Sequence, residues 1–176
     1  MRLSTRVIVP VSCSVLFWGA AALAETKVEL KKVHLCCGAC VKGVGAALKG
    51  IEGVKPACDR EKGTVTLTAT DDAAAQKALD ALAAAGYHGD TGSSSLAIKD
   101  EPNVPKGKVQ SLSLTNSHNC CGSCCKAIKA SVKKVAGVSG DTAKPKTANF
   151  TVTGDFDAAE VVKALNAAGF HVQVKP

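Results

Sequence analysis

The chain has 176 residues, which leaves room for one ordinary domain or two small ones. It is 46% hydrophobic and 21% charged, as is typical of a folded globular protein, and with 3% aromatic residues its core must be built from aliphatic side chains. The formal net charge of +7 is too diffuse to indicate nucleic-acid binding, and the scarcity of aromatic residues argues against RNA binding by base stacking.

The N-terminal segment, residues 1–24, is typical of a secretory signal. Two arginines precede an apolar run at residues 7–21, and an Ala-x-Ala cleavage pattern ends the segment. The alternative is an uncleaved membrane anchor, but the run is short and contains Pro10. We therefore expect an exported protein, periplasmic or extracellular, with no stable membrane span after cleavage.

The chain contains a sequence repeat with an offset of 84 residues. Residues 34–40 read His-Leu-Cys-Cys-Gly-Ala-Cys, and residues 118–124 read His-Asn-Cys-Cys-Gly-Ser-Cys. Further on, residues 84–88 and 167–171 each read Ala-Ala-Gly-aromatic-His. Two tandem copies of one small domain follow from this match. We predict a first domain at 25–98, a linker at 99–107 and a second domain at 108–176.

Hydrophobic periodicity gives the elements of the first copy. In chain order we expect a strand at 27–34, a helix at 39–50, strands at 54–58 and 64–69, and a helix from Asp71 to Gly86. A last strand should follow between residues 87 and 98, but this segment is rich in Gly and Ser and does not define its position.

The second copy repeats the same order. We expect a strand at 108–114, a helix at 124–136, a turn at 144–146, a strand at 148–153, a helix from Asp157 to Gly169 and a last strand at 171–174. The order β-α-β-β-α-β is that of a ferredoxin-like fold. The sequence therefore predicts an α+β protein of two tandem domains, each with a four-stranded antiparallel sheet and two helices on one face.

Cysteines carry the strongest chemical signal. Eight remain after the predicted cleavage, and seven of them fall in the two repeated clusters. Export permits disulfides, yet adjacent cysteines such as Cys36 and Cys37 are poor staples for distant loops. The Cys-x-x-Cys pairs lie where the first strand turns into the first helix, so both thiols of a pair can point at one ion. The helix N-terminus favours the thiolate, which binds soft or borderline ions such as Cu(I), Zn, Cd and Hg.

A Cys-x-x-Cys motif at this place in a β-α-β-β-α-β unit resembles the heavy-metal-associated domains of copper chaperones, metal-pumping ATPases and bacterial mercury-binding proteins. The resemblance spans nearly all of the mature chain, twice. It implies Cu(I) as the ion and a metal-transporting or metal-receiving protein as a partner. The metal ligands that it implies are Cys37 and Cys40 in the first domain and Cys121 and Cys124 in the second.

The chain departs from this family at two places. Leu35 and Asn119 stand where the family has Met, and Cys36 and Cys120 stand where it has Thr, so Zn or another thiophilic ion stays open as the cargo. The extra cysteine is either a third ligand, a spare thiol or a disulfide partner. Of the remaining cysteines, Cys125 aligns with Val41 and is expected to be a buried thiol, and Cys58 a free thiol outside the site.

Four histidines form two pairs matched by the repeat. In the predicted topology, the turn after the second helix lies near the cysteine loop of its own domain. Each domain would then have a pocket of three cysteines and up to two histidines, although duplication alone can also copy ordinary surface histidines. The candidate histidine ligands are His34 and His88 in the first domain and His118 and His171 in the second.

These residues favour an exported metal-binding protein without enzymatic activity, acting as a metallochaperone, buffer or scavenger. Two sites on one chain could also hold one ion between domains. The main alternative is a thiol–disulfide oxidoreductase that uses the Cys-Gly-x-Cys dithiols. A disulfide-bound structural module that binds nothing is the third interpretation.

Overall fold

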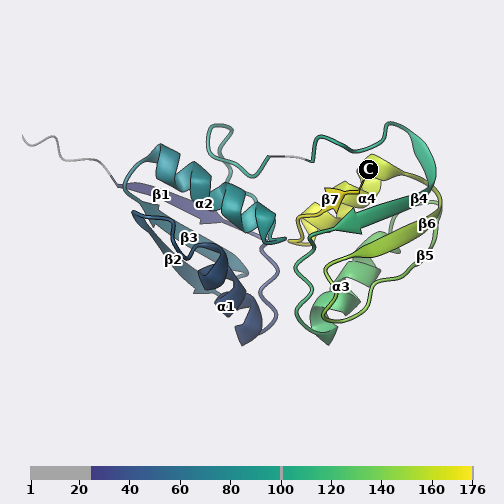
Figure 1. Cartoon of the computed structure of the whole chain (residues 1–176), viewed down its shortest axis with the longest axis horizontal. Coiled ribbons are helices and arrows are strands. Elements are labelled where there is room, and N and C mark those ends of the chain that lie inside the picture. The colour runs from purple at the N-terminus through teal and green to yellow at the C-terminus, as the bar shows by residue number, and fades with distance from the viewer. Residues whose placement is uncertain (1–24, 100, 176) are drawn as a thin grey trace, which may run out of the picture.

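The computed structural model describes residues 25–99 and 101–175. The predicted signal segment, 1–24, lies outside the described residues, so the prediction of export rests on the sequence alone. Two units of similar architecture lie side by side, and the loops between their sheets and first helices run down the middle of the molecule (Figure 1). No helix in the described part of the chain is long and apolar enough to cross a membrane.

The first unit is a three-stranded antiparallel sheet with two helices. Its elements are β1 (Thr26–Leu30), α1 (Gly38–Ala47), β2 (Val54–Asp59), β3 (Thr64–Ala69) and α2 (Asp72–Ala84). The strand order is β1-β3-β2. Val65, Leu67 and Ala69 alternate with more exposed residues along β3 and are buried, because successive strand side chains point to opposite faces. Asp71 caps α2 by accepting a hydrogen bond from the Ala74 N–H at 2.7 Å.

The second unit repeats this arrangement with a complete sheet. Its elements are β4 (Lys108–Thr115), α3 (Gly122–Val132), β5 (Val138–Asp141), β6 (Phe150–Asp157), α4 (Ala158–Ala167) and β7 (Gln173–Val174). The strand order is β5-β6-β4-β7. The core joins Phe150, Val152 and Phe156 of β6 to Ile128 of α3 and Leu165 of α4. The two units together confirm the predicted α+β fold with two ferredoxin-like copies.

The prediction of four strands in each sheet is wrong for the first unit. A single bridge between Lys31 and Asp90 occupies the position where β7 lies in the second unit. After it, the chain forms local side-chain hydrogen bonds: Asp90 accepts from the Gly92 N–H at 2.8 Å, and the Thr91 hydroxyl donates to the Leu96 carbonyl at 2.6 Å. These bonds compete with a strand ladder, so the Gly- and Ser-rich segment continues as a loop.

The first strand of the first unit is also shorter than predicted, whereas that of the second unit agrees with its prediction to within one residue. In the first unit the strand ends at Leu30 and not at His34. Lys32 has a positive φ of 61° and turns the chain out of the sheet. Beyond Lys32 the Val33 N–H donates a hydrogen bond of 2.8 Å to the Gly63 carbonyl in the turn between β2 and β3, and the chain then leads into the cysteine loop.

Candidate metal centre

Two extended loops of the same backbone path carry the cysteines. A residue with positive φ starts each loop, Lys32 (φ 61°) in the first unit and Asn116 (φ 64°) in the second. Each loop ends at an N-cap cysteine, Cys37 or Cys121, in extended conformation. Helix α1 or α3 begins at the next residue, so both clusters lie at the positive end of a helix dipole, where thiolates are stabilised.

Each loop packs against the opposite unit in a reciprocal contact. The turn after α2, at Gly86, touches the backbone of residues 116–118, and the turn after α4, at Gly169, touches the backbone of residues 32–34. The contact is completed by hydrogen bonds from His171 N–H to Gly86 O at 3.0 Å and from His88 N–H to Gly169 O at 3.2 Å, and by a β-bridge between Tyr87 and Phe170. The two units are therefore related by an approximate two-fold axis that brings their cysteine loops together.

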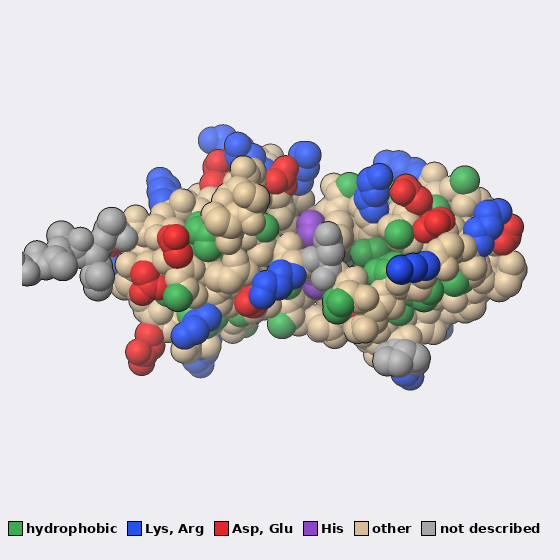
Figure 2. All heavy atoms as spheres, turned by 90° about the horizontal axis from the view of Figure 1, so that it is seen from above, with side chains coloured by type: hydrophobic (Ala, Val, Ile, Leu, Met, Phe, Trp, Pro, Cys, Tyr) green, Lys and Arg blue, Asp and Glu red, His purple; other side chains and the backbone are tan. Residues whose placement is uncertain are grey.

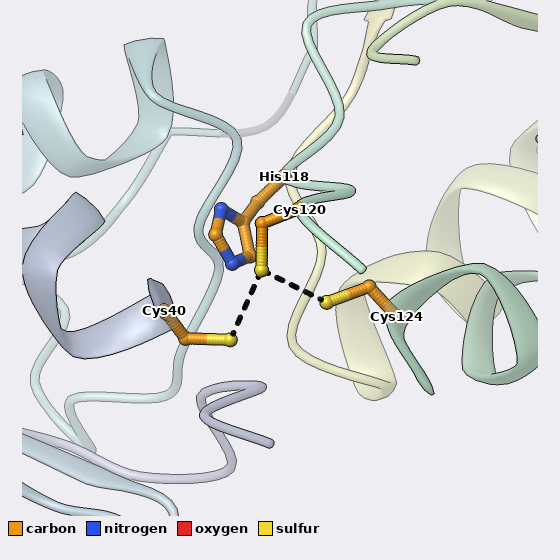
Figure 3. Close-up of side chains that lie close together, drawn as sticks. All are labelled: Cys40, His118, Cys120 and Cys124. Atoms are coloured by element: carbon orange, nitrogen blue, oxygen red, sulfur yellow. Dashed lines mark hydrogen bonds between the residues drawn. The ribbon is translucent and has the colours of Figure 1, made fainter. Parts of the chain in front are cut away.

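Six sulfur atoms, three from each unit, form one cluster between the units, and Figure 3 shows part of it. Within the first unit the Sγ–Sγ distance is 3.6 Å for Cys36 and Cys40 and 3.7 Å for Cys37 and Cys40. Within the second unit the Sγ atoms of Cys120 and Cys121 each lie 3.7 Å from that of Cys124. Between the units Cys36–Cys121 and Cys36–Cys124 are both 3.5 Å, Cys37–Cys120 is 3.8 Å and Cys40–Cys120 is 3.6 Å. All six are free thiols. The structure thus gives one shared cluster where the sequence predicts a pocket in each domain.

The spacing of these sulfurs fits a thiophilic ion. Ligands at ~2.3 Å around a tetrahedral ion such as Zn lie about 3.8 Å apart, close to the 3.5–3.8 Å between the sulfur atoms here. Cys40 and Cys124 are fully buried, and the other four are partly exposed. The donor set is therefore soft, compact and only partly shielded from solvent.

Two histidines flank the sulfurs, and each lies near cysteines of both units. A ring nitrogen of His118 belongs with Cys40, Cys120 and Cys124 to a group of potential ligand atoms within 4.8 Å of one another. His34 forms a similar group with Cys36 and Cys124. The Nε2 atoms of both histidines are buried and have no hydrogen-bond partner among the described residues. Burial lowers the pKa of His118 to about 4 and also lowers the pKa of His34, so both rings are neutral at pH 7, the form that binds metal.

Four of the thiols fall into two electrostatic classes. The backbone N–H of Cys124 at the start of α3, and then the Cys36 thiol, lower the pKa of Cys121 to about 6. The backbone N–H of Cys40 lowers the pKa of Cys37 in the same way. Burial is the main cause that raises the pKa of Cys36 and of Cys120, with further contributions from neighbouring thiols. The helix-capping cysteines therefore favour the thiolate, most strongly Cys121, whereas the raised pKa values of Cys36 and Cys120 favour the protonated thiol until a cation offsets their charge.

Tyr87 supports the cluster from the first unit. Its hydroxyl donates a buried hydrogen bond of 2.7 Å to the carbonyl of Cys40, and its ring stacks on His118 with centroids 4.1 Å apart. Phe170 occupies the matching position in the second unit and lies 4.5 Å from the ring of His34. Each aromatic residue of the Gly-aromatic-His turn therefore holds the histidine of the opposite cysteine loop.

The structure does not bring His88 and His171 to the cysteines. Their Nδ1 atoms lie 3.5 Å apart and their rings stack with centroids 5.8 Å apart. Neither belongs to a group of three potential ligands among the described residues. Histidine side chains appear at the junction of the two lobes in Figure 2. A groove of about 550 Å³ there is lined by residues that include His88, Glu101 and Lys163, and it contains no cysteine.

The last two cysteines lie where the sequence suggests. Cys125 is buried, and its thiol contacts the Ala143 carbonyl at 3.5 Å. Cys58 is half-buried at the end of β2 and lines, together with Cys36 and Arg60, a surface opening of about 710 Å³. Neither belongs to the six-sulfur cluster, although the opening connects Cys36 with solvent.

Three supporting residues are missing from the predicted site. The sequence presents Gly86 and Gly169 only as helix stops, but both have positive φ, and a Cβ at either would collide with backbone of the opposite unit. The role of Tyr87 cannot be predicted from the sequence, because its hydrogen-bond partner is a backbone carbonyl, that of Cys40, which every residue has. The repeated Ala-Ala-Gly-aromatic-His pattern is the one hint that these turns share a role with the cysteine loops.

Comparison with known proteins gives structural matches alone. No protein-family profile and no curated protein sequence matches the chain. Oxidized MerP from Ralstonia metallidurans CH34 is 28% identical, with a TM-score of 0.36, and the match covers 38% of this chain and 97% of MerP. A copper binding domain from HMA7, a P-type ATPase, is 15% identical, with a TM-score of 0.36, and the match covers 39% of this chain and 96% of that domain.

The N-terminal soluble domains of Bacillus subtilis CopA match over a longer part of the chain. The identity is 15%, the TM-score is 0.34, and the match covers 86% of this chain and 95% of that one. The single-domain matches each have the length of one unit, and this match has the length of two.

Proposed function

We propose that this protein is an exported carrier or buffer of a soft metal ion, with Cu(I) as the preferred cargo, and that it is not an enzyme. The observation that carries the proposal is the shared cluster of six free thiols with sulfur atoms 3.5–3.8 Å apart. Thiolate sulfur selects soft ions, and sulfur is the main donor here. The copper binding domain from HMA7 has a similar fold, which is consistent with this cargo.

Further features support reversible binding. Cys121, with a pKa of about 6, is partly exposed and can meet an incoming ion as a thiolate, and the pKa of the partly exposed Cys37 is lowered in the same direction. The opening at Cys36 gives a partner's cysteine access to one edge of the cluster. Exchange of the ion from one thiolate to the next would then pass it to a metal-transporting or metal-receiving protein without releasing it to solvent.

The test is an anaerobic titration of the mature chain with Cu(I) against a chromophoric chelator. We expect the wild-type protein to take Cu(I) from the chelator. The variant C37S/C40S/C121S/C124S should bind at least 100-fold more weakly, whereas C125S, a control at a buried cysteine outside the cluster, should match the wild type. Wild-type binding no tighter than that of the fourfold variant would overturn the proposal.

The alternative of a thiol–disulfide oxidoreductase has one observation in its favour, the pKa of about 6 at Cys121. A low thiol pKa also favours disulfide exchange. A reduction assay on a disulfide substrate separates the two functions: turnover by a chain that fails to compete for Cu(I) establishes the oxidoreductase, and tight Cu(I) binding without turnover excludes it.

A further inference from the structure

The eight sulfur–sulfur contacts contain two closed triangles. In one, Cys36 lies 3.5 Å from both Cys121 and Cys124, which are 3.7 Å apart. The other is its two-fold counterpart and contains Cys120, Cys37 and Cys40, with edges of 3.8, 3.6 and 3.7 Å. Each triangle combines the Cys-x-x-Cys pair of one unit with the leading cysteine of the other unit.

The corresponding triangle within one unit is not closed. Cys36 and Cys37 each contact Cys40, but no such contact joins Cys36 to Cys37 among the described residues. The reason is the extended backbone at the N-cap, with φ −152° and ψ 172° at Cys37. Successive side chains of an extended segment point to opposite sides. The sulfurs of Cys36 and Cys37 therefore lack a contact as short as those of the triangles, although both lie within 4.8 Å of each other and of the Cys121 sulfur. The same conformation at Cys121 separates it from Cys120.

The dimensions of the triangles suit a three-coordinate ion. With edges of 3.5–3.8 Å, the centre of each triangle lies about 2.1 Å from its corners, slightly less than the ~2.3 Å of a metal–sulfur bond. An ion therefore fits at or just above the plane of three sulfurs. Three thiolates from two units would also hold the units together.

We propose that the protein binds two soft monovalent ions in exchanged three-sulfur sites, one formed by Cys36, Cys121 and Cys124 and the other by Cys120, Cys37 and Cys40. This inference rests on the proposed function, because it assigns the ligands of the same cluster. It differs from a pair of separate sites, in which each unit uses its own three cysteines. It also differs from one four-sulfur site shared by Cys36, Cys40, Cys120 and Cys124.

Variants that retain a single triangle separate these arrangements. In the background C37S/C40S, the exchanged site Cys36–Cys121–Cys124 is intact and takes one Cu(I). Adding C36S should weaken Cu(I) binding at least tenfold and reduce the sulfur coordination number from three to two in X-ray absorption spectra. Adding C120S instead should change affinity less than threefold and leave three sulfurs. C58S is the matched control in the first unit, and circular dichroism verifies that each variant is folded.

The mirrored background, C121S/C124S, keeps the experiment decisive if one series fails to fold. In that background C120S should weaken Cu(I) binding and lower the sulfur coordination number, and C36S should change neither. The reverse pattern, with damage from the leading cysteine of the same unit, overturns the exchanged sites. Equal damage from both changes also overturns them, in favour of a shared four-sulfur site. Failure of the proposed function would look different, since the wild-type chain would then take no Cu(I) from the chelator.

Discussion

The two units have almost the same cysteine loop but support it by different contacts. In the first unit Tyr87 bonds the Cys40 carbonyl, and Leu35 is buried among apolar residues. In the second unit Phe170 lacks a hydroxyl, and Asn119 takes the place of Leu35. The Asn119 amide donates to the carbonyls of Lys144 and Thr147 at 2.8 and 3.0 Å. These side-chain hydrogen bonds thus reach the two loops from different residues of each unit.

This difference shows which features the shared cluster requires. The positive-φ residue before each loop, the N-cap cysteine and the glycine of the opposite turn occur in both units. These features fix the backbone path and the approach of the two loops. The side-chain hydrogen bonds of Tyr87 and Asn119 differ between the units, so their position is a matter of local packing in each unit.

The largest effect should come from the glycines that both units share. G86A and G169A each place a Cβ against backbone of the opposite unit at a positive-φ position. Backbone cannot move aside as a flexible side chain can, so we expect either variant to separate the units while each unit stays folded. Small-angle scattering should show a larger radius of gyration, and Cu(I) affinity should fall at least tenfold.

The matched control is G45A, at an exposed helical glycine where a Cβ meets nothing within 4 Å. It should leave the scattering curve unchanged, and Ala raises helix propensity by up to ~1 kcal/mol. If G86A and G169A scatter like G45A, the reciprocal contact does not determine how the units are joined.

A medium effect, on the free energy of unfolding, should come from giving the first unit the residues that the second unit has at Gly43 and Tyr87. At Gly43 a Cβ would collide with the Tyr87 hydroxyl, and the repeat has Ala127 and Phe170 at the matching positions. We expect G43A to destabilise the protein by about 1–3 kcal/mol through overpacking. In the Y87F background the same change should be close to neutral, because the colliding oxygen is gone.

Thermal unfolding of the four proteins gives this coupling directly. Y87F alone should cost about 1 kcal/mol, since it removes one buried hydrogen bond to the Cys40 carbonyl. Additive effects of G43A and Y87F would show that the hydroxyl does not occupy the space that a Cβ needs.

The smallest effect should be a dependence of stability on pH from His34 and His118. Burial lowers the pKa of both, that of His118 from 6.5 to about 4. As pH falls through 6.5, the unfolded chain takes up these protons before the folded chain does. The contribution of these two histidines is therefore level above about pH 6.5 and falls between pH 6.5 and 4, by about 1–2 kcal/mol for His118.

Denaturant unfolding of the metal-free protein at several pH values measures this slope. H118F keeps a ring to stack on Tyr87 and removes the titrating group, so its curve should be flatter in the same window. A wild-type curve that rises on acidification, or an H118F curve as steep as that of the wild type, would contradict the assignment.

Much of the fold and the position of the clustered thiols can be predicted from the sequence. The repeat offset, the alternation along β3 and the cysteine spacing indicate two ferredoxin-like copies with thiols at the start of α1 and α3. The sharing of the cluster cannot be predicted in this way, because matching copies carry no information about how they face each other. That arrangement depends on Gly86 and Gly169, whose roles appear only when the opposite backbone is in place.

The positions of the histidines show the same limit. Topology indicates that the turn of His88 lies near the cysteine loop of its own unit, and Tyr87 does reach Cys40 there. The next side chain along the turn, however, meets its repeat counterpart, His171, across the boundary. The reduction of the last strand of the first unit to one bridge depends likewise on local hydrogen bonds of Asp90 and Thr91, which compete with the ladder.

The approximate two-fold axis has a consequence for the origin of the chain. A surface that meets its own copy about such an axis is self-complementary, as in the isologous interface of a homodimer. Each unit carries both halves of this contact, a glycine turn and a loop that receives one. An ancestor with one unit could thus have paired with a second molecule through the same surface. Gene fusion would have converted that pairing, which depends on protein concentration, into one that a single chain keeps at any dilution.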